Sequence, residues 1–558
     1  MHKSLLGSRI VKWLVGFFAV LILLWVLFRL ITAVSPPSPE ESFESSLERV
    51  EVGRQAFTCQ DSWLKKNEYG LWEMYLSGSE FQLGAKNGIL ARELIAYQEE
   101  VFVEKLQEMV PSEFYLNFLK QVIVLMNRNL DRYIPLEYQR EIQGVSQHAS
   151  DSFSFIGPAY QRILGYHAAH DIGHALQNMN LVACTALGVN GERSQDGKLL
   201  VGRNFDFSMG DKFSRDKIVA FYRPDKGYKF AFITWGGMIG VVSGMNDQGL
   251  VVTLNAAKSG IPGSSKTPVS ILARQILQYA SNIKEAYDIA GESETFVAES
   301  FLVSSAADNK TVVIEKSPDN MGLYDPGGDY LLLTNHFQSE TFRDTERTRK
   351  NRAEGASLYR WERTMELMDS TARHDPYSFA RLLRDQKGMG GENIGMGNEK
   401  AVNQLIAHHS VIFKPSELKM WVSTSPYQLG TYLCYDLNQV FADSTRVMNR
   451  IWQSEESIEA DPFLDSKQFE AFRKYTSESA RLKEYIESGK VGSISDADLE
   501  DYLQLNPHFY YPWFIAGEIL RVRGDAEGAA VYYKEALSRE LPRKVDREQV
   551  EQAKASLE

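Results

Sequence analysis

The sequence predicts an α+β protein in which two antiparallel sheets pack face to face and helices cover their outer sides, an α/β/β/α sandwich. From residue 181 onward, short strand-like runs and helical runs follow one another in blocks, not as one helix per strand. Asp196-Gly197 and Asn246-Asp247-Gln248-Gly249 stand between strand-like runs and are typical of hairpin turns. Hairpins join antiparallel neighbours, so both observations favour antiparallel sheets.

Residues 1–34 predict a cytoplasmic tip and a single membrane-spanning anchor. Lysine and arginine occur before an uninterrupted apolar run from Trp13 to Phe28, and the span extends past Arg29 to Val34. The basic flank favours a cytoplasmic N-terminus, which places the rest of the chain on the outer, periplasmic or extracellular side. A cleaved signal peptide is the rival interpretation. The length of the run and the lack of a small-x-small site in "ITAVSPPSPEES" favour a signal-anchor that is kept.

Length and composition predict a globular protein with two or three domains. The chain has 558 residues, of which 44% are hydrophobic and 24% are charged. The net charge of −12 is spread along the chain without long runs, which argues against a nucleic-acid partner.

The elements follow in order. Residues 35–58 are predicted as a polar linker, and residues 59–183 as a mainly helical segment because apolar residues recur there at helical spacing. Residues 184–455 hold the β-rich domain. Its predicted strands are 184–189, 198–205, 228–235, 238–245, 250–256, 300–306, 311–316, 330–335, 408–414, 419–425 and 431–437, and its helices are 268–291, 354–369 and 375–386.

Two later segments differ from this body. The glycine-rich stretch "GMGGENIGMGNEK" (388–400) lacks the Lys-Ser/Thr of a phosphate-binding loop, so it is either a mobile loop near a site or a segment without function. Residues 465–558 resemble one tetratricopeptide unit, a helical hairpin that packs on the body or binds a protein partner. Its characteristic residues are Trp513, Gly517, Ala529, Tyr533, Ala536 and Pro542.

Cys184 opens a strand-like run and has three interpretations: a buried small hydrophobe, half of a disulfide, or a nucleophile. The following turn centres near residue 194, so antiparallel pairing puts Cys184 opposite about residue 204, close to Arg203 and Asp206. Arginine favours the thiolate, and aspartate can hold an amine or orient a donor. This neighbourhood favours the nucleophile.

These residues, with the motifs around them, resemble the N-terminal-nucleophile hydrolases, a group that includes bile salt hydrolases, penicillin V acylase and acid ceramidase. Cys184 is followed by "GRNFDF", "GMNDQGL", "TLNA" and "TNHF". Upstream, "LWEMYLSGSEFQLGAKNG" and "IPLEYQREIQGVSQHA" resemble the pro-region of the acyl-coenzyme A:6-aminopenicillanic acid acyltransferase family. The resemblance covers about residues 70–440, and the anchor and the tail lie outside it.

The resemblance implies a four-layer α/β/β/α sandwich and a precursor that cuts itself between Ala183 and Cys184. Residues 59–183 would then be a pro-segment and residues 184–455 the catalytic domain. Cys184 would be the nucleophile, and its freed α-amine, which titrates near ~8, would be the base.

The resemblance also assigns the other site residues. Arg203 and Asp206 match the pair that holds the nucleophile, Asn255 matches the oxyanion-hole asparagine, and Asn335 matches a second site asparagine. Arg360 in "SLYRWER" matches a late arginine that follows a serine, with Arg363 as the alternative. The competing interpretations are a structural ion pair for Arg203 with Asp206, turn caps for the asparagines, and a helix-surface arginine for Arg360.

His167, His170 and His174 fall on one helical face with Asp171 nearby, so a zinc site is conceivable. The stretch lies upstream of the expected cut, and the chemistry needs no metal or other cofactor. We therefore favour a histidine face packed near the entrance to the site.

The remaining cysteines, Cys59 and Cys434, are expected to pair in an oxidising compartment and to tie the pro-segment to the β body. Two functional classes stay open. One is an exported cysteine amidohydrolase or acyltransferase that acts on a small amide substrate. The other is an inactive, membrane-tethered scaffold whose tail binds a partner. The intact set of site residues favours the enzyme.

Overall fold

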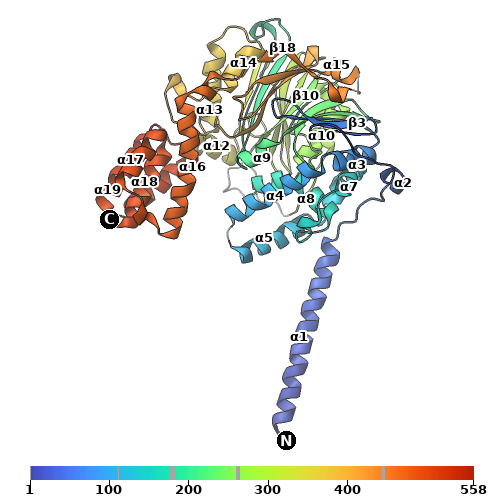
Figure 1. Cartoon of the computed structure of the whole chain (residues 1–558), viewed down its shortest axis with the longest axis vertical. Coiled ribbons are helices and arrows are strands. Elements are labelled where there is room, and N and C mark those ends of the chain that lie inside the picture. Colours follow the sequence, from blue (N-terminus) through green and yellow to red (C-terminus); the bar gives the residue numbers. More distant parts are fainter. Residues whose placement is uncertain are drawn as a thin grey trace.

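Two β-sheets form the centre of the protein (Figure 1). The computed structural model describes residues 2–110, 112–175, 182–258, 260, 264–442 and 446–557. The larger sheet has, in spatial order, β1 (Val50–Gly53), β2 (Ala56–Cys59), β3 (Ser62–Lys66), β4 (Trp72–Gly78), β7 (Ile218–Pro224), β8 (Phe230–Thr234), β9 (Ser243–Asn246), β10 (Leu250–Ala256), β11 (Glu299–Ser305), β12 (Lys310–Lys316) and β13 (Met321–Tyr324). The smaller sheet has β14 (Tyr330–Leu333), β5 (Val182–Val189), β6 (Leu200–Phe207), β15 (Ala407–Lys414), β16 (Lys419–Ser423), β17 (Tyr432–Asp436) and β18 (Trp452–Ile458).

Alternating side chains of the strands supply separate apolar clusters, as period-2 geometry requires. Tyr75 on β4 and Val201 on β6 belong to a cluster that lies between the two sheets. Met74 belongs to a second cluster, on the outer face of the larger sheet. Leu187 belongs to a third, on the outer face of the smaller sheet. The mixed α+β class predicted from the sequence is confirmed.

Helices cover both outer faces. Those that pack on the larger sheet are α3 (Glu80–Leu90), α4 (Arg92–Met109), α7 (Leu136–Ser146), α8 (Ala159–Ala175), α10 (Val269–Tyr279) and α11 (Ile283–Glu292). Those that pack on the smaller sheet are α13 (Ser357–Asp369) and α14 (Pro376–Leu383). The other helices of the body are α2 (Glu41–Glu44), α5 (Glu113–Met126), α6 (Leu130–Tyr133), α9 (Asp211–Arg215), α12 (Glu346–Glu354) and α15 (Leu437–Ala442).

Residues 50–78 correct two predictions. They were expected to be the end of a linker and the start of a helical segment, and they form β1 to β4 instead. β4 pairs in parallel with β7, from Trp72 opposite Ile218 to Gly78 opposite Pro224. The other strand pairs of the described sheets are antiparallel. A parallel pair is not joined by a hairpin turn, so the turn residues in the sequence could not predict how this segment joins the larger sheet.

At the N-terminus, α1 (His2–Thr32) projects away from the body (Figure 1). Its stretch Lys12–Thr32 is long and apolar enough to cross a membrane, and none of its most apolar window is buried. A signal sequence has the same properties.

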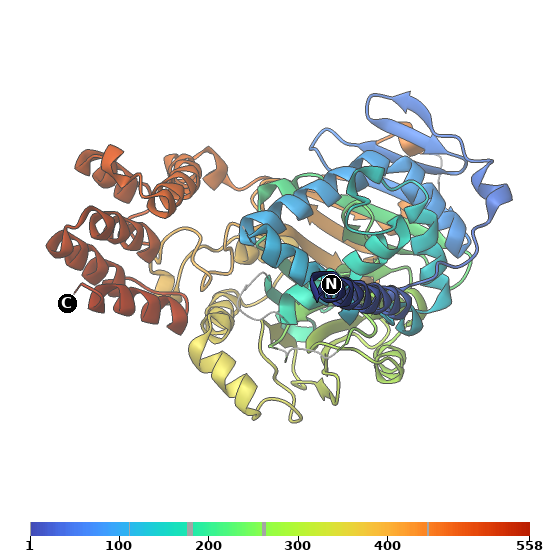
Figure 2. The same cartoon turned by 90° about the horizontal axis from the view of Figure 1, so that it is seen from below.

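The tail forms a helical unit on one side of the sheets (Figures 1 and 2). Its helices are α16 (Lys467–Ser488), α17 (Asp496–Leu505), α18 (Tyr510–Arg523), α19 (Ala526–Ser538) and α20 (Lys544–Ala555). The close approach of α18 to α19 requires Gly517, because a Cβ there would lie 2.6 Å from the Tyr533 ring. Tyr533 packs on Phe514 at 6.1 Å between ring centroids, and Trp513 packs on Tyr532 at the same separation.

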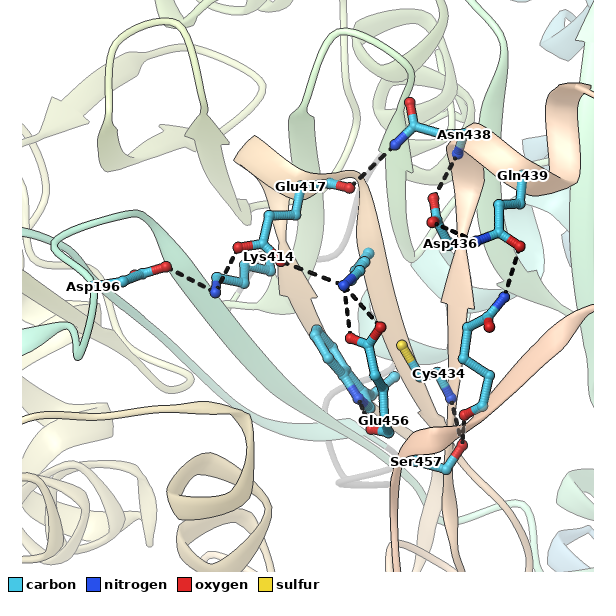
Figure 3. Close-up of polar contacts among 12 residues, drawn as sticks. Asp196, Lys414, Glu417, Cys434, Asp436, Asn438, Gln439, Glu456 and Ser457 are labelled. Atoms are coloured by element: carbon cyan, nitrogen blue, oxygen red, sulfur yellow. Dashed lines mark hydrogen bonds and ion pairs between the residues drawn. The ribbon is translucent and has the colours of Figure 1, made fainter.

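The expected Cys59–Cys434 disulfide is wrong, since both cysteines are free and buried. Cys59 belongs to the cluster under the helices of the larger sheet, whereas Cys434 packs on the outer face of the smaller sheet. Both sheets therefore lie between the two sulfur atoms. Figure 3 shows Cys434 beside Glu456 and Ser457, and its backbone N–H donates to Ser457 Oγ (3.1 Å).

Candidate active site

The β5–β6 hairpin places Cys184 next to the charged pair that the sequence pointed to. Cys184 pairs with Phe205, one position from the predicted residue 204, and Ala183 pairs with Asp206. Side chains two apart on a strand share a face, so Arg203 lies on the same face of the sheet as Phe205 and Cys184. Asp206 lies on the opposite face.

Arg203 contacts the thiol directly. Its Nη2 donates to Cys184 Sγ (3.0 Å) and to the carbonyl of Leu254, and its Nη1 donates to Ser243 Oγ (2.6 Å). Neither Cys184 nor Arg203 has exposed surface. Burial raises the pKa of the Cys184 thiol, and the Arg203 charge opposes this rise. In this structure the thiol is thus protonated at neutral pH and shielded from solvent.

Asn335 and Arg360 hold the backbone of Cys184. The Cys184 N–H donates to Asn335 Oδ1 (2.9 Å), and Arg360 Nη2 donates to the same oxygen and to the Cys184 carbonyl (3.3 Å). Arg360 Nε donates to Thr185 Oγ1 (3.0 Å). Arg360 is only 2% exposed, so it is not a helix-surface arginine. The alternative, Arg363, is engaged in an ion pair with Asp385 (3.0 Å).

Asp206 is a buried carboxyl with one oxygen engaged. Gln404 Nε2 donates to its Oδ2 (3.2 Å), and its Oδ1 has no hydrogen-bond partner among the described residues. Burial raises the pKa of Asp206 to about 7, against the opposing charges of Arg360 and Arg203. This carboxyl can therefore gain or lose a proton near neutral pH.

Asn255 lies close to the site but is turned toward backbone carbonyls. Its Nδ2 donates to the carbonyls of Thr334 (3.2 Å) and Leu333 (3.4 Å), and its Oδ1 has no hydrogen-bond partner in the described structure. Two carbonyl neighbours require an NH₂ group, which fixes the orientation of the amide. Asn255 must release one of these carbonyls before it can donate to an oxyanion.

Sequence reasoning missed several supporting residues. Ser243 fixes Arg203, Ser357 Oγ accepts the backbone N–H of Asn335 (2.8 Å), and Gln404 holds Asp206. Glu299 begins β11 with both carboxyl oxygens buried and without a hydrogen-bond partner among the described residues, and burial raises its pKa well above the usual value. An acidic residue at the head of the apolar run "ESFLVSS" was the available signal for Glu299.

His167 has a structural role. It is fully buried, its Nδ1 donates to the Ile163 carbonyl (2.8 Å), and its Nε2 accepts the Ile239 N–H (3.0 Å). Burial lowers the pKa of His167 to about 4, so it is neutral. The side chains of His170 and His174 lie outside the described residues. Across the side chains that are described, no group of three His, Cys, Asp or Glu residues is placed to hold a metal ion.

An open cleft of about 590 Å³ adjoins the segments that carry Asn255 and Asn335. Phe337 and Phe342 stack in its wall with ring centroids 4.5 Å apart. Other residues that line it are Lys258, Lys266, Phe296, Ala298, Asp319 and Arg347. The cleft thus combines an aromatic wall with cationic side chains.

Two curated proteins match parts of the chain. An uncharacterised protein of Archaeoglobus fulgidus is 24% identical over 271 residues, which is 46% of this chain and 45% of that protein. The N-acylethanolamine-hydrolyzing acid amidase of Caenorhabditis elegans is 25% identical over 199 residues, 34% of this chain and 53% of the amidase. The chain thus spans about half the length of the curated relatives it matches.

Solved structures are similar at lower identity. The Caenorhabditis elegans N-acylethanolamine-hydrolyzing acid amidase ortholog is 19% identical, over 42% of this chain and 93% of that chain, with a TM-score of 0.30. A conjugated bile acid hydrolase of Clostridium perfringens is 14% identical, over 46% of this chain and 92% of that chain, with a TM-score of 0.32.

A family model matches residues 193–425, a range that begins downstream of Cys184 and includes Arg203, Asp206, Asn255, Asn335 and Arg360. This model is that of the acyl-coenzyme A:6-aminopenicillanic acid acyl-transferase family, so the resemblance predicted from the sequence is confirmed over this range.

Proposed function

We propose that the protein is a membrane-anchored, exported cysteine hydrolase or acyltransferase that cleaves or transfers the acyl group of an amide substrate. The observation that carries this proposal is the set of contacts around Cys184. Arg203 contacts the thiol, Asn335 accepts the backbone N–H, and Arg360 contacts the carbonyl. A structural core cysteine needs none of these contacts.

Self-cleavage comes first in the proposed mechanism. Cys184 Sγ attacks the carbonyl carbon of Ala183, the C–S bond forms, and the C–N bond breaks. The thiol proton passes to the departing nitrogen of Cys184. Asp206 is the proposed carrier, because it lies across the ladder from Ala183 with one oxygen unengaged and a pKa of about 7. Water then hydrolyses the thioester, which restores the thiol and leaves a carboxylate on Ala183.

The cut creates the base for turnover. The freed α-amine of Cys184 stays beside Asn335 Oδ1, which already accepts its N–H at 2.9 Å. In turnover the amine takes the thiol proton while Sγ attacks the substrate amide. Asn255 is the proposed oxyanion donor, once its Nδ2 leaves the Thr334 or Leu333 carbonyl. The leaving amine takes the proton, and water or an acyl acceptor completes the reaction.

The cleft beside Asn255 and Asn335 is the proposed substrate site. Its volume of about 590 Å³ suits a small molecule. The stacked pair Phe337 and Phe342 can pack against an apolar part of the substrate, and Lys258 and Arg347 can face a negatively charged part.

Membrane anchoring through α1 has further support in α5. Phe114, Tyr115 and Phe118 on α5 are 86%, 52% and 56% exposed. Figure 1 shows α5 on the side of the body from which α1 projects. The charge of Arg29 on α1 reaches Lys120 of α5, where it lowers the pKa in addition to burial. Exposed aromatic side chains at this level suit a membrane interface, with the body on the outer side.

The domain assignment belongs to the same proposal. The two sheets and their helices are a four-layer N-terminal-nucleophile sandwich, formed by the pro-segment and residues 184–455, and the tail from residue 465 is a tetratricopeptide-like unit.

The deciding experiment is mass spectrometry of the purified full-length protein. A mature fragment that begins at Cys184, and selective labelling of that residue by a thiol-reactive amide probe, are expected. Cys184→Ala should abolish both, whereas Cys434→Ala, the matched control at another buried free thiol, should change neither. An uncut wild-type chain that also escapes labelling favours the inactive scaffold.

A further inference from the structure

The segment 394–405, which includes the end of the glycine-rich stretch, lies directly behind the candidate active site. The carbonyl of Glu399 accepts from Arg360 Nη1 (2.8 Å), and the side chain of Gln404 holds Asp206 (3.2 Å). One face of the segment therefore contacts two charged residues of the candidate active site.

The other face of this segment is held by the C-terminal helices. Asn506, at the end of α17, donates to the Met396 carbonyl (2.8 Å) and accepts the Met396 N–H (3.0 Å). Asn506 is only 2% exposed, so these two bonds are shielded from water. Figure 2 shows the chain near residue 400 between the tail helices and the sheets.

A second set of contacts between the tail and this segment involves the loop between α19 and α20. Asn398 Nδ2 donates to the carbonyl of Glu540 (2.9 Å), and Lys400 forms an ion pair with the carboxylate of the same residue. Arg543 lies 3.6 Å from Glu399. The residue whose carbonyl accepts from Arg360 therefore stands between two residues that the tail binds.

Packing joins the same parts. Leu405 belongs to the apolar cluster of the tail, although it follows Gln404 directly. Gly395 has a φ of +86°, and a Cβ there would lie 2.5 Å from the backbone of Phe509. The segment thus fits closely against the tail.

We infer that the C-terminal helical region is a positioning element of the active site, which acts through segment 394–405 to hold Arg360 and Asp206 in place. Asn506 and Glu540 are its positioning residues. The inference rests on the proposed function, because it takes self-cleavage at Cys184 as the reaction. The tail lies outside residues 193–425, the part of the chain that matches the family model, so the inferred positioning role belongs to a region that this model does not include.

A double-mutant cycle on the full-length protein tests the inference, with the rate of appearance of the fragment that begins at Cys184 as the measurement. Arg360→Lys should slow cleavage about 100-fold, and Asn506→Ala about 10-fold. If Asn506 acts through Arg360, the double variant should be no slower than Arg360→Lys alone. Rates that multiply to about 1000-fold would overturn the inference.

The pH profile supplies a readout that a purely structural role would not move. Loss of Arg360 from its position removes a charge that opposes the raised pKa of Asp206. The midpoint of the cleavage profile should therefore move to higher pH in Asn506→Ala. An unchanged midpoint together with an unchanged rate would also overturn the inference.

Controls separate positioning from folding. Asp496→Asn removes the ion pair with Arg523 inside the tail, away from the segment, and should change the rate less than twofold. If Asn506→Ala fails to fold, the Lys400–Glu540 pair replaces it: Lys400→Glu and Glu540→Lys should each slow cleavage, and the double reversal should restore it. No recovery in the double reversal would contradict the inference.

Failure of the proposed function gives a different result. In that case the wild-type protein stays uncut, or Cys184→Ala is still cut, with or without substitutions in the tail. Hydrogen exchange then tests the coupling without any activity. Asn506→Ala should speed exchange in residues 394–405 and 182–186 together, and faster exchange in the first range alone would refute coupling to the site.

Discussion

Ala183 lies opposite Asp206 across the β5–β6 ladder, so the residue on the acyl side of the proposed cut faces a buried carboxyl. Burial raises the pKa of Asp206 to about 7, which lets it exchange a proton at neutral pH. This relationship offers the proposed self-cleavage a proton carrier before any free α-amine exists.

Asp206→Asn should slow self-cleavage by roughly 10²–10⁴-fold. In the wild type the rate should rise with pH and reach half its plateau near pH 7, because only the carboxylate can accept the thiol proton. The measurement is the fraction of cut chain against time between acidic and basic pH. A wild-type rate that does not depend on pH would remove Asp206 from this role.

The same substitution should stabilise the fold at high pH. The pKa of Asp206 is about 7 in the folded chain and ~3.9 in an unfolded chain, so its contribution to stability is intact below about pH 4 and is lost as pH rises through 7. Asp206→Asn should raise the free energy of unfolding by on the order of 2 kcal/mol at pH 8 and by little at pH 4. Denaturant unfolding of uncut Cys184→Ala protein, with and without Asp206→Asn, measures the difference.

Cys184→Ala should be uncut and inactive, because the sulfur performs both reactions. Cys184→Ser should be cut slowly and turn over poorly, since an oxygen nucleophile in this site has the same contacts but lower reactivity. N-terminal sequencing and an amide hydrolysis assay follow the two steps separately. Amide hydrolysis by Cys184→Ala at the wild-type rate would show that another group is the nucleophile.

Asn255→Ala should lower kcat by about 10²–10³-fold with little change in KM. The reason is that its amide is proposed to meet the oxyanion only in the transition state, after it leaves the carbonyls of Leu333 and Thr334. Screening N-acyl amino acids, penicillins and fatty amides first identifies a substrate, and steady-state kinetics then compare the variants. A change confined to KM would instead assign Asn255 to substrate binding.

After cleavage the two fragments should stay together without a covalent link. β4 remains paired with β7, and the three cysteines are free, so reductant should not separate the fragments. Size-exclusion chromatography should show one species with or without reductant, and two only in denaturant. If reductant alone separated the fragments, the two would be linked by a Cys59–Cys434 disulfide, contrary to the structure.

Residue patterns predicted the part of the site that depends on one hairpin. Asn335 and Arg360, which reach Cys184 from distant segments, were named only through the family resemblance. Turn chemistry placed Cys184 within one position of its true partner, Phe205. Gln404 reaches Asp206 from 198 positions away, a contact that no local period encodes. Arg360 was named as a site residue only through the resemblance, with a helix-surface arginine as the competing interpretation; it is buried, and the carbonyl of Glu399 in segment 394–405 accepts from it.

The fold shows the same limit. From residue 184 onward most strands were predicted, where hairpin turns separate them, but β7, β13 and β18 were not. β4 was missed because its parallel partner begins at Ile218, with several helices between the two in sequence. The count of three cysteines favoured a disulfide, but it carries no information about which side of a sheet each sulfur faces.

Under the proposed anchoring and cleavage, the parallel pairing of β4 with β7 decides where the mature enzyme resides. If the chain is cut before Cys184, the catalytic fragment has left the polypeptide that carries α1. This fragment then stays at the membrane only through the seven residue pairs between β4 and β7 and the packing around them, because no peptide bond links it to α1. Any treatment that separates β4 from β7 would turn an immobilised enzyme into a diffusing one, with its nucleophile and its base on the part that departs.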